Sequence, residues 1–402
     1  MNTNILDELT VVADTKIVYF IMDGLSGLPM KEGGKTELQA ARIPNLDNLA
    51  ARSICGLIDP VMPGVTPGSG PAHLALFGYD PIEHNIGRGV LSALGVDFKL
   101  TSRDVAARLN FATADKNGTI TDRRAGRIST EENERLCEVL RKGIRLSGGV
   151  EFFLQTESEH RALLVLRGDG LGGEVNDTDP QKEGLKPIAA EGRDAPSKKT
   201  AAAVSEFVSR VREILKDEKK ANVILARGFA KHVPPKSMQE RFKLNPLAVA
   251  VYPMYRGLAR LVGMDVAEVA GDLKEQVKIL KDNFARHDFF YFHVKKTDSY
   301  GEDGNFEAKV HIIEEVDAIM PEVLSLKPDV IVVTGDHSTP SKLKSHSWHP
   351  VPVLLWSEYC RQDEVTRFDE ISCIRGGLGR MPSLHLMGVT LANARRLVKY
   401  GA

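Results

Sequence analysis

Cysteine is scarce in this sequence, and the four cysteines present are scattered. Cys55, Cys137, Cys360 and Cys373 form neither a C-x-x-C motif nor a dense framework. That excludes a small scaffold held together by disulfides and is typical of a reducing cytoplasm, where cysteines serve as small core residues. We therefore expect a cytoplasmic protein whose cysteines do not carry its chemistry.

Long apolar runs and an excess of charge of either sign are also absent. No apolar run approaches the ~20 residues that span a bilayer. The amino terminus, M-N-T-N-I-L-D-E-L-T, lacks the basic patch and apolar segment of a signal peptide. The net formal charge is −1, which gives no case for nucleic acid or an anionic membrane as the main partner. A soluble cytoplasmic protein fits these absences, while the oligomeric state stays open.

The length of 402 residues exceeds what one hydrophobic core usually supports, which predicts two domains. Strand-like apolar runs alternate with helix-like segments in both end regions, as in an α/β fold with a parallel sheet. Residues 97–243 have a different texture, with short alternating strands, amphipathic helices and a polar loop. We predict an α/β domain formed by residues 1–96 and 244–402, into which residues 97–243 are inserted as a smaller α+β domain.

Three of the predicted strands are followed by an acidic residue. Asp23 follows Y-F-I-M, Asp298 follows F-H-V-K-K-T, and Asp336 follows V-V-T-G. One such Asp is an ordinary turn or cap residue, but an open α/β sheet brings the carboxyl ends of its strands to one edge, where ligands bind. Carboxylates gathered there repel one another unless a cation neutralises them, so their convergence predicts a metal.

Histidines extend this predicted site with nitrogen ligands. His337 directly follows Asp336, and His346 and His349 follow in H-S-W-H-P-V-P. A ligand set of mixed oxygen and nitrogen favours Mn²⁺ or Zn²⁺ over Ca²⁺ or Mg²⁺, which prefer shells of oxygen alone.

Ser69 lies between glycines in P-G-S-G-P-A-H, just before an apolar helix. Taken alone, this segment favours a serine N-cap, worth ~1 kcal/mol. The alternative is a nucleophile at a helix amino terminus, where backbone N–H groups and the helix dipole favour an incoming phosphoryl group. The flanking glycines carry no side chains that would block that approach.

Taken together, these segments resemble the archaeal-type cofactor-independent phosphoglycerate mutases of the alkaline phosphatase superfamily. The resemblance covers nearly the whole chain, and its most specific stretches are F-I-M-D-G-L at 20–25, P-G-S-G-P-A-H-L-A-L-F-G-Y-D-P at 67–81, G-R-G-V-L-S-A-L-G at 87–95, D-R-R-A-G-R at 122–127 and K-K-T-D-S-Y-G-E-D-G-N-F-E-A-K at 295–309. It implies an alkaline-phosphatase-like fold. It also implies interconversion of 3-phosphoglycerate and 2-phosphoglycerate through a phosphoserine, without 2,3-bisphosphoglycerate.

The resemblance implies two metal ions, Mn²⁺ or Zn²⁺ with Co²⁺ or Mg²⁺ as alternatives, one held by Asp23, Ser69, Asp336 and His337 and the other by Asp298 and His346. Relatives often carry His at the place of Glu302, and an oxygen ligand there would shift the site towards Mn²⁺. His349 stands where relatives commonly carry Asp, and it ranks below His346 as a ligand.

Arginines are the expected substrate ligands. Arg123 and Arg127 lie in D-R-R-A-G-R, and Arg227 follows the apolar run I-L-A. Most arginines are solvated or form surface ion pairs, but phosphoglycerate carries a phosphate and a carboxylate, which guanidinium groups bind bidentately. The resemblance implies substrate contacts from these arginines, and a phosphate contact from Arg256, where relatives usually have Lys.

The implied mechanism has two phosphoryl transfers. Ser69 attacks the phosphate, the phosphoserine persists while glycerate stays bound, and the phosphoryl group returns to the other hydroxyl. Water must be excluded, and closure of the inserted domain would exclude it. Two alternatives remain: a metal-dependent phosphomonoesterase of the same superfamily, in which water wins the second step, and a metal-binding pseudoenzyme, suggested by the departures at Glu302, His349 and Arg256.

Overall fold

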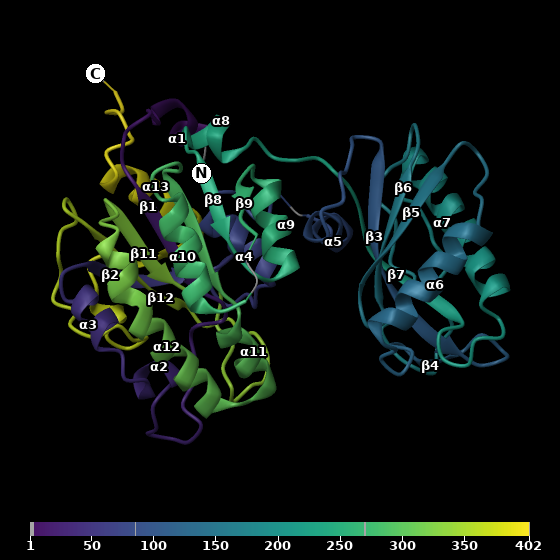
Figure 1. Cartoon of the computed structure of the whole chain (residues 1–402), viewed down its shortest axis with the longest axis horizontal. Helices are drawn as coiled ribbons and strands as arrows, with labels where there is room; N and C mark the ends of the chain where they lie inside the picture. The colour runs from purple at the N-terminus through teal and green to yellow at the C-terminus, as the bar shows by residue number, and fades with distance from the viewer. Residues whose placement is uncertain (1–3, 85, 269–270, 402) are drawn as a thin grey trace. The chain divides into compact units, whose positions relative to one another are not determined.

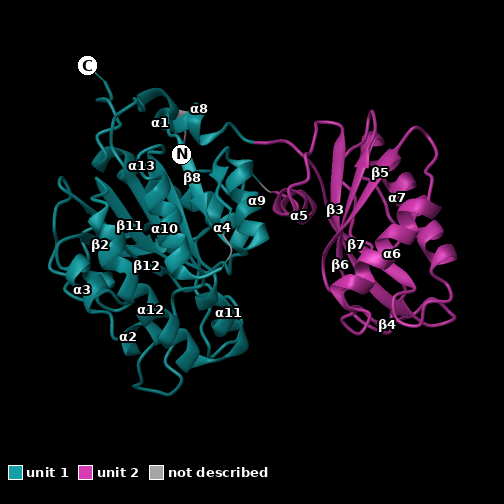
Figure 2. Ribbon diagram, viewed as in Figure 1, with its two compact units in different colours: residues 1–85, 235–402 teal, residues 86–234 magenta. Residues whose placement is uncertain are grey.

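The computed structural model describes residues 4–84, 86–268 and 271–401 and consists of two compact units (Figures 1 and 2). Unit 1 comprises Met1–Asn85 and Pro235–Ala402, and unit 2 comprises Ile86–Pro234. These boundaries lie earlier in the chain than the predicted 97 and 243. The reason is packing: helix α5 (Arg88–Gly95) packs on strands of unit 2, and helix α8 (Met238–Phe242) packs on helix α1 (Asn4–Leu9) of unit 1.

Unit 1 is built on an eight-stranded sheet in the order β13-β2-β12-β11-β1-β10-β8-β9. Its strands are β1 (Ile17–Met22), β2 (Ile54–Asp59), β8 (Pro246–Val249), β9 (Asp265–Val266), β10 (Phe289–Val294), β11 (Val330–Thr334), β12 (Val351–Ser357) and β13 (Gly379–Pro382). Strand β12 runs antiparallel to its two neighbours, and the other pairs are parallel. The predicted α/β class with a largely parallel sheet is confirmed.

Helices cover this sheet (Figure 1). They are α1, α2 (Glu37–Ala40), α3 (Pro44–Ala50), α4 (Ser69–Leu76), α8, α9 (Pro253–Leu261), α10 (Leu273–Asn283), α11 (Lys296–Asp303), α12 (Phe306–Ser325) and α13 (Leu386–Asn393). Every residue of β1 is buried, as expected for a central parallel strand with helices on both faces. Across the described ranges, none of the helices has the length and apolar character needed to cross a membrane.

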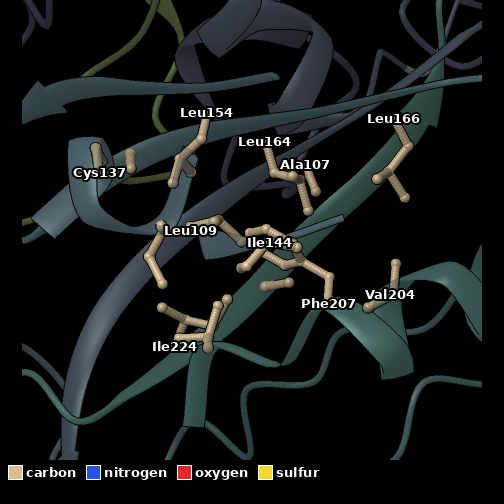
Figure 3. Packing of buried hydrophobic residues seen from close by; sticks show 14 of the residues in the cluster. Ala107, Leu109, Cys137, Ile144, Leu154, Leu164, Leu166, Val204, Phe207 and Ile224 are labelled. Atoms are coloured by element: carbon tan, nitrogen blue, oxygen red, sulfur yellow. The ribbon is translucent and has the colours of Figure 1, made fainter. Parts of the chain in front are cut away.

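Unit 2 is a five-stranded sheet with two long helices packed against it (Figures 2 and 3). Its elements are α5, β3 (Asp104–Ala114), β4 (Ile120–Asp122), α6 (Thr130–Gly143), β5 (Glu151–Ser158), β6 (Arg161–Arg167), α7 (Ala195–Ile214) and β7 (Val223–Lys231). Alternate residues of β3, including Ala107 and Leu109, join Phe207 of α7 in one apolar core. On α5, a Cβ at Gly89 would lie 2.2 Å from the Ala106 carbonyl oxygen, so this close approach to β3 requires glycine.

Candidate functional site

The three predicted acidic residues meet at one edge of the unit 1 sheet. Strand β1 lies between β11 and β10, and Asp23 and Asp336 follow the carboxyl ends of β1 and β11. Asp298 belongs to the first turn of α11, after β10 has ended at Val294. The helix, rather than the strand itself, therefore positions this third carboxylate.

Asp23, Asp336 and His337 form the first group that could hold a metal ion, with ligand atoms all within 4.8 Å of one another. Nε2 of His337 lies 3.4 Å from Oδ1 of Asp23 and 3.2 Å from Oδ2 of Asp336. All three side chains are fully buried. Among the described residues, Oδ1 of Asp23 has no hydrogen-bond donor, whereas Oδ2 of Asp23 contacts Lys295 and Oδ2 of Asp336 contacts His73.

The second group comprises Asp298, His337 and His346. Nε2 of His346 lies 3.6 Å from Oδ1 of Asp298 and 3.8 Å from Oε1 of Glu302. The rings of His337 and His346 stack with centroids 3.7 Å apart. Glu302 is exposed, and it stands beside this group without belonging to it.

Hydrogen bonds determine which ring nitrogen of His337 carries the proton and which carries the lone pair. Oγ1 of Thr339 donates its single hydrogen to Oδ1 of Asp298 at 2.6 Å, because a carboxylate only accepts. The same Oγ1 lies 3.1 Å from Nδ1 of His337 and so accepts the proton of that nitrogen. Nε2 is then unprotonated and faces two carboxylates. Burial also lowers the pKa of His337, which favours this neutral ring.

A buried lone pair and two buried carboxylates that face one another repel unless a cation lies between them. The donor set of oxygen and imidazole nitrogen matches the ligands of Mn²⁺ and Zn²⁺. The Thr339 hydrogen bonds match the outer partners that orient metal-binding histidines. The residues present therefore fit divalent metal ions.

Gly24 lets these ligands approach the backbone closely. Its φ is +61°, and a Cβ there would lie 2.5 Å from Oγ1 of Thr339 and 2.7 Å from Oδ1 of Asp298. Its N–H donates to Oδ1 of Asp336 at 3.0 Å. The buried Lys309 ammonium donates to the carbonyl oxygens of Gly24 at 2.7 Å and Thr339 at 2.8 Å, which ties the two loops together.

Ser69 is not an N-cap, so the interpretation favoured by its segment alone is wrong. The N-cap of α4 is Gly68, and Ser69 is the first helical residue. Oγ of Ser69 lies 3.1 Å from Nε2 of His337. The buried His73, one turn later, has Nδ1 2.9 Å from the Ser69 carbonyl oxygen and 3.2 Å from Oδ2 of Asp336. The hydroxyl is thus held at a helix amino terminus beside the first ligand group.

Two side chains beside Asp23 were not predicted: His293 in β10 and Lys295 just after the end of that strand. Nζ of Lys295 lies 3.0 Å from Oδ2 of Asp23 and also pairs with Oδ2 of Asp298. Nε2 of His293 lies 3.5 Å from Oδ2 of Asp23. Burial works to raise the pKa of Asp23, but His293 and Lys295 outweigh it and hold that pKa well below its ordinary range. Asp23 is therefore an ionised carboxylate.

His349 lies in neither ligand group of the described residues. Its Nδ1 lies 2.9 Å from Oγ of Ser347, and its carbonyl oxygen accepts a hydrogen bond from Ser338. Its ring stacks on Trp348 with centroids 5.0 Å apart.

In unit 2, two of the predicted arginines come together around buried Asp179. Arg123 donates to both carboxylate oxygens, at 3.0 and 2.7 Å, and Nη1 of Arg227 lies 3.6 Å from Oδ2. Burial works to raise the pKa of Asp179, but Arg123 outweighs it and the pKa is lowered. The other two predictions lie elsewhere: Arg127 is exposed on the turn after β4, and Arg256 is on α9 of unit 1.

Arg123 and Arg227 line a cavity of about 210 Å³ that is rich in positive charge. The described residues around it are Arg88, Arg108, Asn110, Arg123, Arg124, His160, Arg161 and Arg227. Arg108 pairs directly with Arg227 across β3 and β7, although like charges directly opposite one another destabilise a sheet. Glu157 lies 3.6 Å from Arg108, and Asp177 and Asp179 each lie 3.6 Å from Arg227. These carboxylates offset part of the repulsion, and a bound anion would offset more. The sequence signal was weak, because strand pairing and the packing of α5 on β3 bring these arginines together from distant segments.

Comparisons with known proteins give matches that share one description. A family model described as 2,3-bisphosphoglycerate-independent phosphoglycerate mutase matches residues 50–221. A probable 2,3-bisphosphoglycerate-independent phosphoglycerate mutase from one strain of Thermus thermophilus is 54% identical over 401 residues, with 99% of both chains covered. A protein of the same name from Thermotoga maritima is 51% identical over 397 residues, covering 99% of this chain and 98% of its own.

Solved structures are similar over the same length. A protein from Pyrococcus horikoshii has a TM-score of 0.83 at 31% identity, covering 97% of this chain and 100% of that chain. The cofactor-independent phosphoglycerate mutase from Thermoplasma acidophilum has a TM-score of 0.71 at 30% identity, covering 94% of this chain and 100% of that chain.

Proposed function

The chain belongs to the family of 2,3-bisphosphoglycerate-independent phosphoglycerate mutases, and from that membership we propose that it interconverts 3-phosphoglycerate and 2-phosphoglycerate through a phosphoserine on Ser69. The observation that carries the phosphoserine is the position of Oγ of Ser69, 3.1 Å from Nε2 of His337. This hydroxyl stands at the amino terminus of α4 and beside the first ligand group.

We propose that Asp23, Asp336 and His337, with Ser69, hold one metal ion, and that Asp298 and His346 hold the other, with Glu302 as a further ligand. Bound there, divalent metal ions would favour ionisation of the serine hydroxyl and neutralise charge on the attacking and leaving oxygens. Mn²⁺ or Zn²⁺ fits the mixed donor set best.

The proposed reaction consists of two successive phosphoryl transfers, first to Ser69 and then back to glycerate. Ser69 attacks phosphorus, and the bond from phosphorus to the substrate oxygen breaks, which leaves glycerate and phosphoserine. The N–H groups at the start of α4 face the transferred group and favour its negative charge. The other hydroxyl of glycerate then attacks the phosphoserine and regenerates Ser69.

We propose that the arginine cavity of unit 2 binds the anionic groups of the substrate and retains glycerate between the two transfers. Guanidinium groups bind carboxylates bidentately. Asp179 orients the planar groups of Arg123 and Arg227. Arg108, Arg88 and Arg161 join the set because they line the same cavity.

The experiment that tests this function supplies 3-phosphoglycerate to the purified protein without 2,3-bisphosphoglycerate. Formation of 2-phosphoglycerate is measured in parallel with release of inorganic phosphate. We expect 2-phosphoglycerate as the main product. Stoichiometric phosphate release without 2-phosphoglycerate would assign the chain to the phosphomonoesterases instead.

Replacing Glu302 with glutamine is expected to weaken binding of the second metal ion, by about tenfold, because the substitution removes one anionic ligand. The adjacent Asp303 offers a matched control, since both side chains are exposed. Titration of Mn²⁺ by calorimetry into Glu302→Gln and Asp303→Asn compares them. Equal affinities in the two variants would exclude Glu302 as a ligand.

Replacing Asp179 with asparagine is expected to raise KM for 3-phosphoglycerate about tenfold with a smaller change in kcat. The substitution removes the negative charge and one of the two acceptor oxygens that orient Arg123. Asp169→Asn serves as the control, because it breaks the exposed ion pair with Arg103 in the same unit. Steady-state kinetics measure both. An unchanged KM in Asp179→Asn would contradict a substrate role for the arginines it holds.

A further inference from the structure

The ammonium of Lys295 lies between the carboxylates of the two ligand groups. Nζ is 3.0 Å from Oδ2 of Asp23, which belongs to the first group, and pairs with Oδ2 of Asp298, which belongs to the second. Asp23 in turn lies 3.4 Å from Nε2 of His337, the nitrogen that faces Ser69. A single flexible cation therefore sits where both groups require positive charge.

A metal ion on these carboxylates would require the ammonium to move. The histidine nitrogens of the two groups face Oδ1 of Asp23 and Oδ1 of Asp298, whereas the ammonium lies on Oδ2 of both carboxylates. A metal ion on these carboxylates would be a second cation on the other side of the same carboxylate groups, and the two cations would repel in a site with little water. Two aromatic rings adjoin the ammonium and would favour it after such a move. Nζ lies 5.6 Å from the ring centroid of Tyr252 and 5.7 Å from that of Tyr255, and aromatic faces attract cations. The lysine side chain is 24% exposed and has a four-carbon stem, so it can reorient.

We propose that Lys295 is a resident cation of the site, which neutralises Asp23 and Asp298 in the metal-free protein, is displaced when metal binds, and then contacts the phosphoryl group transferred to and from Ser69. The proposal rests on the two-metal site of the proposed function. Oδ2 of Asp23 contacts Lys295, and its Oδ1 lies 3.4 Å from Nε2 of His337, which is 3.1 Å from Oγ of Ser69. A phosphoryl group on Ser69 would therefore be an anion close to the displaced ammonium. Lysine suits this role because its compact charge binds phosphate from several directions.

The adjacent lysine provides the control. Lys296 is exposed, and no ion pair to it is found in the described part of the chain, so Lys296→Met removes the same charge without the same contacts. Binding of Mn²⁺ to metal-stripped protein is measured by calorimetry in wild type, Lys295→Met and Lys296→Met. We expect Lys295→Met to bind Mn²⁺ about tenfold more tightly than wild type, a factor that corresponds to ~1.4 kcal/mol. Lys296→Met should match wild type.

A second measurement follows inorganic phosphate as the probe on protein loaded with Mn²⁺. Phosphate should bind Lys295→Met about tenfold more weakly than wild type, because one charge-assisted contact is missing. Lys295→Arg provides a variant that keeps the charge if Lys295→Met does not fold. Since arginine pairs with carboxylates bidentately, Lys295→Arg should bind Mn²⁺ more weakly than wild type.

The outcomes separate this proposal from the proposed function. Wild type that binds no Mn²⁺ would overturn the two-metal site itself. Wild type that binds Mn²⁺ with the same affinity as Lys295→Met, or more tightly, would leave that site intact and overturn the displacement of Lys295. Unchanged phosphate affinity in Lys295→Met would overturn its contact with the phosphoryl group.

Discussion

Replacing Ser69 with alanine is expected to reduce mutase activity by roughly 10⁴-fold or more, because the substitution removes the only oxygen that can carry the phosphoryl group in the proposed mechanism. Metal binding should persist, since Asp23, Asp336 and His337 keep their ligand atoms within 4.8 Å of one another. A coupled assay of 2-phosphoglycerate formation, together with metal analysis of the variant, measures both effects.

Ser345→Ala is the matched control for this variant. Ser345 is exposed, lies next to His346, and donates a hydrogen bond to the Leu343 carbonyl oxygen at 3.2 Å. Its replacement should leave activity at the wild-type level. Turnover retained in Ser69→Ala, with product formed at more than a trace rate, would show that Ser69 does not carry the phosphoryl group.

Replacing Asp336 with asparagine is expected to weaken metal binding by about 100-fold or more and to reduce activity accordingly. Asparagine keeps the size of the side chain and can still accept the hydrogen bond from Gly24, which is 3.0 Å long. It removes the negative charge beside His337 and His73. The loss of metal affinity and activity would therefore be caused by the missing negative charge of the ligand and not by a change in packing.

Metal-stripped protein separates this effect from misfolding. Wild type should lose activity on chelation and regain it when Mn²⁺ is returned, while Asp336→Asn should need a far higher concentration. Circular dichroism and thermal unfolding of both metal-free proteins check that the fold is intact. Recovery of Asp336→Asn at the wild-type Mn²⁺ concentration would exclude Asp336 as a ligand.

The sheet and two of the three acidic residues could be predicted because their physical cause is local. Buried strands such as β1 and β11 are short, nearly unbroken apolar runs, and a polar residue directly after such a run must lie at the sheet edge. Asp23 and Asp336 follow from this rule. The family predicted from the motifs is confirmed by relatives of the same length.

The roles of Lys295 and Thr339 in the unit 1 site could not be predicted from local sequence patterns. Lys295 and Lys296 are identical in type and adjacent in sequence, yet one is paired with two carboxylates and the other is exposed. Only the end of β10 at Val294 and the start of α11 decide which of them points inward. Thr339 likewise gains its role through a contact with Asp298, far away in sequence.

The arginine cavity of unit 2 was predicted only in part, because it depends on strand register. Arg123 and Arg227 were assigned from the resemblance, and both line the cavity. Arg127, assigned on the same basis, is exposed and is not among the described residues that line the cavity. Arg108 could not be assigned to the cavity from the sequence. It lies there because β3 pairs with β7, which places Arg108 opposite Arg227, more than a hundred residues away along the chain.

The stereochemistry of transfer at phosphorus tests the central claim most directly. Substrate whose phosphoryl group is made chiral with oxygen isotopes is converted by the enzyme, and the configuration of the product is determined. Two successive in-line displacements, first onto Ser69 and then back to glycerate, predict overall retention of configuration. Overall inversion would mean a single direct transfer between the two hydroxyls and would contradict the phosphoserine mechanism.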